Sequence, residues 1–281
     1  MQIGKFKITS IETGQFALDG GAMFGVIPKA LWQRAYDGGD EKNRIPLTAR
    51  LLVVEWENRK MLIDTGIGTK YDEKFAKIYN LEQGKIDVEW ALGNYGFNSN
   101  DITDVVLTHL HFDHVGGATK FVNGELIPTF PNAKYYIQKE QYKWGMKPSI
   151  KDKASYMGEN YVPLEREGLL ELIDGTGDLF LGIKVISTDG HTKGMQLIEI
   201  EDDNKSLLYV GDLAPTTAHL PYAYGMGYDN EPLKTIEEKQ KYFARAADKG
   251  SIIFFEHDVY TVAAKLEADK RGFIVKEKIK F

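Results

Sequence analysis

The pattern of apolar and polar positions divides the chain into short strands and a few amphipathic helices. Apolar and polar residues alternate over Ile3–Thr13, Leu47–Trp56 and Lys60–Asp64, as expected for strands that bury one face. Apolar residues spaced by three and four predict helices over Tyr71–Leu81 and Asp87–Tyr95. Both strands and helices are therefore expected in the first third of the chain.

The rest of the chain continues in the same way. Short apolar runs predict further strands over Asp104–Thr108, Ala133–Gln138, Ile183–Thr188, Leu197–Ile200, Ser206–Val210, Ser251–Phe255 and Gly272–Lys276. The turn-forming residues Asp202, Asp203 and Asn204 predict a hairpin between two of them. Leu233–Lys249 is expected to be a helix that stops at Gly250. We predict an α/β or α+β protein with helices outside layered sheets. No linker or repeat divides residues 1–281, so a single domain is expected.

Two stretches, Phe16–Arg44 and Ala214–Glu231, resist a regular assignment. Both combine glycines with large apolar side chains, a combination that is uncommon in long loops unless they shape a site. We interpret both stretches as candidate pocket walls. The candidate substrate-binding residues in them are Met23, Phe24, Trp32 and Tyr222. The alternative for each of these side chains is packing that only holds its loop in place.

Composition and charge exclude several classes of protein. With 43% hydrophobic and 27% charged residues among 281, the chain can bury a core and is not intrinsically disordered. No run approaches the ~20 apolar residues of a membrane-spanning helix, and no secretory signal precedes the first predicted strand, so we expect a cytoplasmic protein. The absence of cysteine excludes disulfides, a thiol nucleophile and cysteine metal ligands.

The charge balance bears on the partner. A net charge of −6 argues against binding to duplex nucleic acid or to an anionic membrane, so a small neutral or weakly charged substrate is expected. The 15 tyrosines fit either an apolar pocket or an oligomer interface, which leaves a homodimer open.

The histidines give the strongest chemical signal. Three of the six lie in the run His109-Leu110-His111-Phe112-Asp113-His114, directly after a predicted buried strand. Because side chains alternate along a strand, His109 and His111 are expected on the same side. Clustered imidazole and carboxylate groups are what a transition-metal site requires. A solvated polar loop is the alternative, and the clustering disfavours it.

This motif resembles the signature of the metallo-β-lactamase-fold hydrolases. The later motifs of that family are matched in order by Asp64-Thr65-Gly66, Gly190-His191-Thr192-Lys193-Gly194, Leu207–Asp212 and Phe254–His257. The resemblance covers about residues 47 to 258. It implies a four-layer αβ/βα sandwich, with two mixed β-sheets and outer helices, and a metal site at the sheet edge where the ligand loops meet.

The same resemblance implies a ligand set. Seven ligands are too many for one four-coordinate zinc ion but suit two ions that share a carboxylate. The first ion would be held by His109, His111 and His191, the second by Asp113, His114 and His257, with Asp212 bridging. Zinc is expected, with manganese, iron and cobalt as alternatives. A hydroxide between the metals would be the nucleophile.

Further roles follow for individual residues. Asp113 and Asp212 are the candidate catalytic residues among the ligands. His219 has no ligand position left; it is either a loop histidine bonded to backbone or a residue that contacts substrate, and we retain it as a third catalytic candidate. Asp64 is expected to orient a ligand histidine, with a turn cap as its alternative role.

The loops outside the ligand motifs resemble those of quorum-quenching lactonases of the YtnP-like group, over Asp19–Trp32 and Gly211–His219. This implies a dinuclear hydrolase that opens lactones, with N-acyl homoserine lactones as the first candidate. A phosphotriesterase or arylesterase, a glyoxalase II-like thioesterase and an iron-binding redox protein are the alternatives. One position departs from the pattern: related lactonases carry a tyrosine three residues after the bridging aspartate, where this chain has Pro215.

Overall fold

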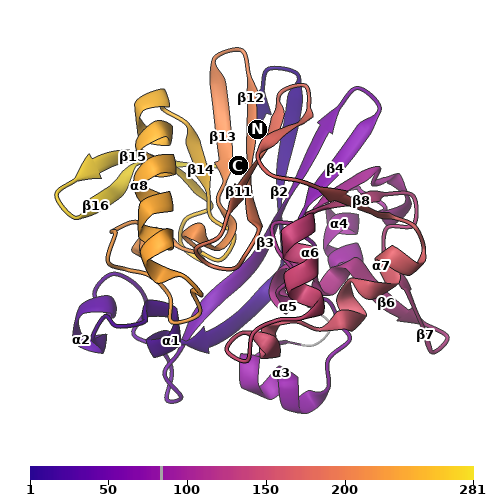
Figure 1. The fold of residues 1–281 in the computed structure, drawn as a ribbon, viewed down its shortest axis with the longest axis horizontal. Coiled ribbons are helices and arrows are strands. Elements are labelled where there is room, and N and C mark those ends of the chain that lie inside the picture. Colours follow the sequence, from indigo (N-terminus) through magenta and orange to yellow (C-terminus); the bar gives the residue numbers. More distant parts are fainter. Residues whose placement is uncertain (83–84) are drawn as a thin grey trace. The chain divides into compact units, whose positions relative to one another are not determined.

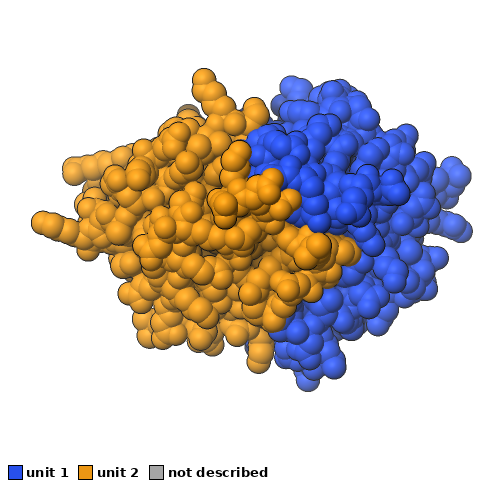
Figure 2. All heavy atoms as spheres, turned by 90° about the horizontal axis from the view of Figure 1, so that it is seen from above, with its two compact units in different colours: residues 1–15, 49–175 blue, residues 16–48, 176–281 orange. Residues whose placement is uncertain are grey.

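The computed structural model describes residues 1–82 and 85–281, which form two compact units. Unit 1 consists of Met1–Gln15 and Ala49–Gly175, and unit 2 of Phe16–Thr48 and Thr176–Phe281. Figure 2 colours unit 1 blue and unit 2 orange. Each unit is built on one large mixed sheet, so each is described by itself.

The sheet of unit 1 has seven strands in the order β1-β2-β3-β4-β5-β8-β9. Their bounds are Gln2–Ile3, Phe6–Asp19, Arg44–Trp56, Arg59–Ile63, Asp104–Val106, Lys134–Gln138 and Leu170–Ile173; the last residues of β2 and the first of β3 are counted with unit 2. Pairing is antiparallel for β1–β2 and β3–β4, and parallel for β4–β5, β5–β8 and β8–β9. Parallel neighbours send their carboxyl ends to one edge, where loops can gather side chains.

Helices and a small hairpin complete unit 1. The helices are α3 (Glu73–Tyr79), α4 (Val88–Asn94), α5 (Phe112–Val115), α6 (Lys139–Met146) and α7 (Val162–Arg166), and the hairpin joins β6 (Thr119–Val122) to β7 (Glu125–Pro128). Both predicted helices are confirmed, a residue or two shorter at each end. Asp72 starts α3 by accepting a hydrogen bond from the Phe75 amide at 2.8 Å. Residues of α4 and α6 pack on one face of the sheet in a buried core (Figure 1).

The sheet of unit 2 follows the chain order from β10 to β16. The bounds are Gly177–Phe180, Ile183–Thr188, Met195–Asp202, Lys205–Tyr209, Ile252–Phe254, Ala263–Asp269 and Gly272–Ile279. Only β13 and β14 pair in parallel, since the long helix α8 (Pro232–Lys249) connects them; it packs on the sheet and ends at Gly250 with a φ of 66° (Figure 1). The predicted hairpin is confirmed, with Asp203 and Asn204 in the left-handed region.

The two stretches without a predicted pattern differ in the structure. Within Phe16–Arg44, β2 continues to Asp19 and two short helices follow, α1 (Gly20–Phe24) and α2 (Lys29–Trp32). The expectation of an irregular segment is therefore corrected there, because such short helices carry no periodicity and depend on Asp19 as N-cap and on packing. Ala214–Glu231 contains only a 3-10 turn over Thr217–His219, as expected.

The strands and helices of both units confirm the predicted mixed α/β class. None of the helices in the described part of the chain combines the length and the apolar character needed to cross a membrane.

Candidate metal centre

Unit 1 carries a first pair of candidate ligand groups in the segment that follows β5. The buried imidazoles of His109 and His111 face each other, with Nε2 of the first 3.0 Å from Nδ1 of the second. Two ligand atoms on one tetrahedral ion with bonds of about 2.0–2.1 Å lie about 3.3 Å apart. The spacing therefore suits two ligands of the same ion, and the expectation that both side chains share one side is confirmed.

A second pair lies one turn further, on the short helix α5. Asp113 and His114 are buried, and the Asp113 Oδ2 lies 3.9 Å from the His114 Nε2. Helix α5 follows His111 directly, so four ligand groups are placed by one strand end and one helical turn.

Asp64, directly after β4, contacts His114 itself and reaches His109 through Thr108. Its carboxylate accepts hydrogen bonds from the Thr108 amide at 2.6 Å and the Thr108 hydroxyl at 2.7 Å, and it lies 3.1 Å from Nδ1 of His114. Because the Thr108 hydroxyl donates to Asp64, it accepts from Nδ1 of His109 at 3.0 Å. Both imidazoles are thereby held with Nδ1 protonated and Nε2 available for a metal. Asp64 contacts the candidate ligand His114 as predicted, and its role in orienting a metal ligand stays a prediction.

Asp64 is held in an unusual backbone conformation, with a φ of 58°. Aspartate is one of the few residues that adopts the left-handed region at modest cost. Such conformations persist where the surroundings define them closely, and they concentrate at functional sites.

An aromatic wall, formed by Tyr71, Phe75, Tyr79 and Phe112, stands beside these ligands. Phe112 lies between the ligand residues His111 and Asp113 in sequence, and its ring centroid is 5.1 Å from that of Phe75 and 4.8 Å from that of Tyr79. Phe75 and Tyr79 are only partly buried. None of these four residues was among the predicted site residues. The spacing of Tyr71, Phe75 and Tyr79 by four, which places them on one helix face, was the available signal.

In unit 2, the imidazoles of two candidate ligands, His191 and His257, converge on the carboxylate of a third, Asp212. Its Oδ2 lies 3.2 Å from Nε2 of His191, and its Oδ1 lies 3.3 Å from Nε2 of His257. Asp212 and His257 follow the parallel strands β13 and β14, so they emerge at the same edge of the sheet. Each carboxylate oxygen thus faces a different imidazole, which is the arrangement that a carboxylate shared by two ions requires.

The Nδ1 atoms of these two imidazoles also have hydrogen-bond partners. Nδ1 of His191 lies 3.0 Å from Oδ1 of Asp229, and Nδ1 of His257 donates to the Thr48 carbonyl at 2.8 Å. With Nδ1 as the donor, each ring in its metal-binding tautomer directs an Nε2 lone pair at an oxygen of Asp212. Lone pairs this close repel unless a cation lies between them, so the donor set fits divalent metal ions. Asp229 and Thr48 were missed by the sequence analysis, since no local pattern links either residue to its histidine.

Four other predicted residues of unit 2 lie together in one buried cluster, namely Met23, Phe24, Trp32 and His219. The His219 ring stacks on Phe24, with centroids 4.7 Å apart, and Phe24 stacks on Trp32 at 5.1 Å. Nε2 of His219 donates to the Met23 carbonyl at 2.8 Å. Its Nδ1 accepts from the Thr216 hydroxyl at 2.8 Å. Both ring nitrogens of His219 are hydrogen-bonded, so the side chain stabilises the loop that carries it. Its catalytic role stays a prediction.

Tyr222 does not join this cluster. Its ring packs on Phe273 at 5.9 Å, and its amide donates to the Arg271 carbonyl. Substrate contacts of Met23, Phe24, Trp32 and Tyr222 also stay predictions.

The environment of His219 predicts a pH effect on stability. Burial, and next the charge of Lys239, lowers the pKa of His219 to about 4. The unfolded chain therefore binds this proton more readily than the folded one, so the contribution is complete above about pH 6.5 and is lost as the pH falls towards 4. We expect His219→Phe to reduce the loss of unfolding free energy between pH 7 and pH 4.5 by about 2 kcal/mol.

Urea unfolding of both proteins at matched zinc concentration measures this difference. Equal pH dependence in the variant and the wild type would contradict the assignment of that proton uptake to His219.

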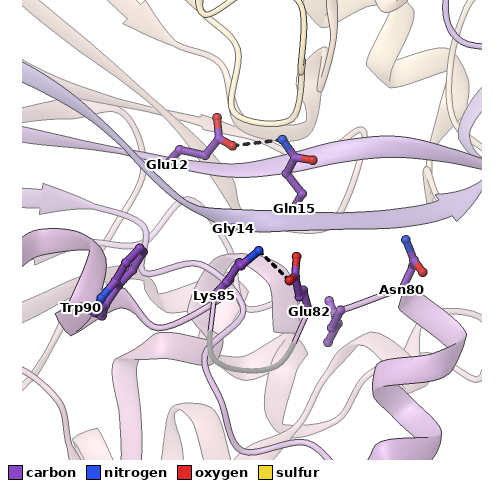
Figure 3. Close-up of a pocket in the computed structure, with 8 residues that line it drawn as sticks. Glu12, Gly14, Gln15, Asn80, Glu82, Lys85 and Trp90 are labelled. Carbon is purple, nitrogen blue, oxygen red and sulfur yellow. Dashed lines mark hydrogen bonds and ion pairs between the residues drawn. The ribbon is translucent and has the colours of Figure 1, made fainter. Parts of the chain in front are cut away.

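A pocket of about 670 Å³ lies elsewhere in unit 1 (Figure 3). Its described lining residues are Glu12, Gly14, Gln15, Asn80, Leu81, Glu82, Lys85 and Trp90. Lys85 pairs with Glu82 at 2.6 Å, and Gln15 donates to Glu12 at 3.3 Å. None of the predicted site residues is among them.

Comparisons with known proteins agree with this geometry. The family model described as the metallo-beta-lactamase superfamily matches residues 51–257. An N-acyl homoserine lactonase of Bacillus thuringiensis is 25% identical over 231 residues, which cover 74% of this chain and 80% of that protein. Among solved structures, a probable metal-dependent hydrolase from Staphylococcus aureus has 30% identity and a TM-score of 0.88, with 100% of both chains covered.

A second solved structure is AidC, a dizinc quorum-quenching lactonase in complex with a product. It has 21% identity and a TM-score of 0.84, and the match covers 100% of this chain and 97% of that one, so this likeness shows the fold. The homologues and structural neighbours are metal-dependent hydrolases, lactonases among them. The predicted fold is confirmed.

Proposed function

Because the chain belongs to the metallo-beta-lactamase superfamily, we propose that it is a dinuclear metal-dependent hydrolase that opens lactones, N-acyl homoserine lactones first. The observation that carries the proposal is the position of Asp212 between the Nε2 atoms of His191 and His257. The substrate class is supported by the relative from Bacillus thuringiensis, which is an N-acyl homoserine lactonase.

The proposed ligand set assigns the seven side chains to two ions. His109, His111 and His191 serve the first, Asp113, His114 and His257 serve the second, and Asp212 serves both. Bound divalent ions, of which zinc is the first candidate, lower the pKa of a water molecule and polarise the carbonyl oxygen that is attacked. The spacings of 3.0 Å within unit 1 and of 3.2 and 3.3 Å within unit 2 support this assignment.

The residues around the ligands maintain this arrangement. Asp64 and Thr108 hold the Nδ1 protons of His114 and His109, respectively. Asp229 and Thr48 do the same for His191 and His257. Four rings are therefore fixed in the tautomer that leaves Nε2 for metal binding, so little reorganisation is needed when the ions bind.

The aromatic wall supports an apolar substrate group. Phe75, Tyr79 and Phe112 pack together beside the ligand pair of unit 1, and Phe75 and Tyr79 keep part of their surface exposed. An acyl chain gains about 0.8 kcal/mol for each methylene that it buries on such a surface. A neutral lactone with an acyl tail thus matches the chemistry better than a charged substrate.

Tyr79 is expected to donate a hydrogen bond to the substrate, a contribution that Pro215 cannot supply. Among the described residues its hydroxyl has no hydrogen-bond partner, whereas the Tyr71 hydroxyl accepts from Asn160 Nδ2 at 3.1 Å. Burial, and then the charge of Asp113, raises the pKa of Tyr79, so the phenol keeps the proton that it would donate.

We predict that Tyr79→Phe lowers kcat/KM for lactones about tenfold, the effect of one hydrogen bond of about 1.4 kcal/mol. Steady-state kinetics on zinc-loaded protein measure this, and metal content and thermal unfolding should remain those of the wild type. Tyr71→Phe is the matched control, expected to affect stability more than rate. Unchanged kinetics in Tyr79→Phe would contradict the assignment.

A hydrolysis panel on zinc-loaded protein tests the proposed function. It contains N-acyl homoserine lactones of several chain lengths, a paraoxon-type phosphotriester, an aryl ester and a glutathione thioester. We expect lactone opening that a chelator abolishes and that zinc restores. Turnover of the phosphotriester or the thioester with no turnover of any lactone would replace the proposal by the corresponding rival.

A further inference from the structure

We infer that Asp229 is a positioning residue that couples the ligand His191 to the apolar loop formed by residues 20–32. The metal affinity of the His191 side and the conformational order of the neighbouring segment 214–231 then depend on the same carboxylate. The inference rests on the proposed metal centre and extends it, because it assigns a role to a carboxylate outside the ligand set.

Both oxygens of the buried Asp229 carboxylate are used, each on a different part of the unit. Oδ1 lies 3.0 Å from Nδ1 of His191, and Oδ2 accepts from the Met226 amide at 3.1 Å. The neighbouring backbone pairs with the ligand segment as well, since the Asn230 amide donates to the His191 carbonyl at 2.9 Å. The imidazole of His191 and the turn at Met226 are therefore held by the same carboxylate, that of Asp229.

The turn at Met226 is in direct contact with the apolar loop. The Gly227 amide donates to the Ala22 carbonyl at 2.8 Å. The backbones approach so closely that a Cβ on Gly25 would lie 3.1 Å from the Gly225 carbonyl oxygen. A shift of the turn must therefore displace the loop that carries Met23 and Phe24.

A buried lysine removes the remaining freedom of this segment. The ammonium of Lys239, on α8, donates to the carbonyls of His219 and Tyr224 at 2.9 Å each. Since His219 in turn donates to Met23, the segment is held at His219, at Tyr224 and at Asp229. Because the segment is fixed at these points, a displacement of the Asp229 carboxylate must be accompanied by movement of the His191 side chain or of the apolar loop.

Asp229→Asn separates the two functions of the carboxylate. An amide has one oxygen, so its nitrogen must face either the Nδ1 proton of His191 or the amide proton of Met226. One of the two contacts is lost in either orientation. Loss of a partner that orients a ligand histidine typically costs about 10–100-fold in metal affinity.

The experiment measures zinc affinity and the protection of segment 214–231 from proteolysis, rather than turnover. Zinc affinity is determined by competition with a chromogenic chelator, and protection by the rate of chymotrypsin cleavage at Tyr222, Tyr224 and Tyr228 with and without zinc. For the wild type we expect zinc to slow cleavage. For Asp229→Asn we expect about 10–100-fold weaker binding of one ion and little zinc-dependent protection.

Glu238→Gln is the matched control. This buried carboxylate accepts from the Asp189 and Gly190 amides at 2.8 and 3.1 Å, beside the same histidine, but contacts no ligand side chain. We expect Glu238→Gln to retain zinc affinity and protection. Asp229→Ser serves as the second variant if Asp229→Asn does not fold, with the same expected result.

Three results would overturn the inference. These are wild-type zinc affinity in both Asp229 variants, weakened affinity with unchanged protection, and a wild type whose cleavage is insensitive to zinc. A zinc-loaded wild type that opens no lactone contradicts the proposed function alone, because neither readout depends on lactone turnover.

Discussion

Replacing Asp212 with Ala is expected to reduce the metal content from about two ions per chain to one or none and to lower kcat/KM by more than ~100-fold. Its two oxygens face Nε2 of His191 and Nε2 of His257 at 3.2 and 3.3 Å, so its loss removes a ligand from both ions of the proposed centre. Even residues that only orient a ligand contribute about 10–100-fold, and a shared ligand must contribute more. Metal analysis after gel filtration in zinc-containing buffer, together with lactone kinetics, measures both effects.

His219→Ala is the control for this prediction. His219 is buried in the same unit but bonds to Met23 and Thr216, so its loss should leave metal content unchanged. If Asp212→Ala retained two ions, or if wild-type protein supplied with zinc held no more than one, the shared-ligand role of Asp212 would be refuted.

The second large effect concerns the acyl chain of the substrate. We expect kcat/KM for N-acyl homoserine lactones to rise with chain length by up to about fourfold per carbon, since each buried methylene contributes ~0.8 kcal/mol at best. Phe75→Ala and Phe24→Ala are both expected to flatten this rise without removing metal. Kinetics over chains of 4 to about 12 carbons measure the slope.

The two variants differ in their expected cost in stability. Phe24 is fully buried between Trp32 and His219, so its truncation should cost about 3–5 kcal/mol. Phe75 is partly exposed, so Phe75→Ala should lower the free energy of unfolding by less. Flattening by only one variant would assign the acyl chain to that side chain alone. A rate independent of chain length in the wild type would exclude an apolar acyl site.

Elements whose signals are local could be predicted from the amino-acid sequence alone. The strands and the longer helices follow from periodicity, and their ends follow from residues such as Asp72 and Gly250, because caps and turns act over a few residues. The ligand pairs of unit 1 were predictable for the same reason. His109, His111, Asp113 and His114 occupy one strand end and one helical turn, so their proximity depends on no distant part of the chain.

Two of the partners that hold the candidate ligands, Asp229 and Thr48, could be found only in the folded structure. Asp229 lies 38 residues from His191, and Thr48 lies 209 residues from His257. Neither residue belongs to a motif; Asp229 stands in a segment without periodicity, and Thr48 acts through a backbone carbonyl, which any residue could supply. The physical reason is that a hydrogen bond between distant residues depends on how the strands and loops pack, and no local preference of the chain records that packing.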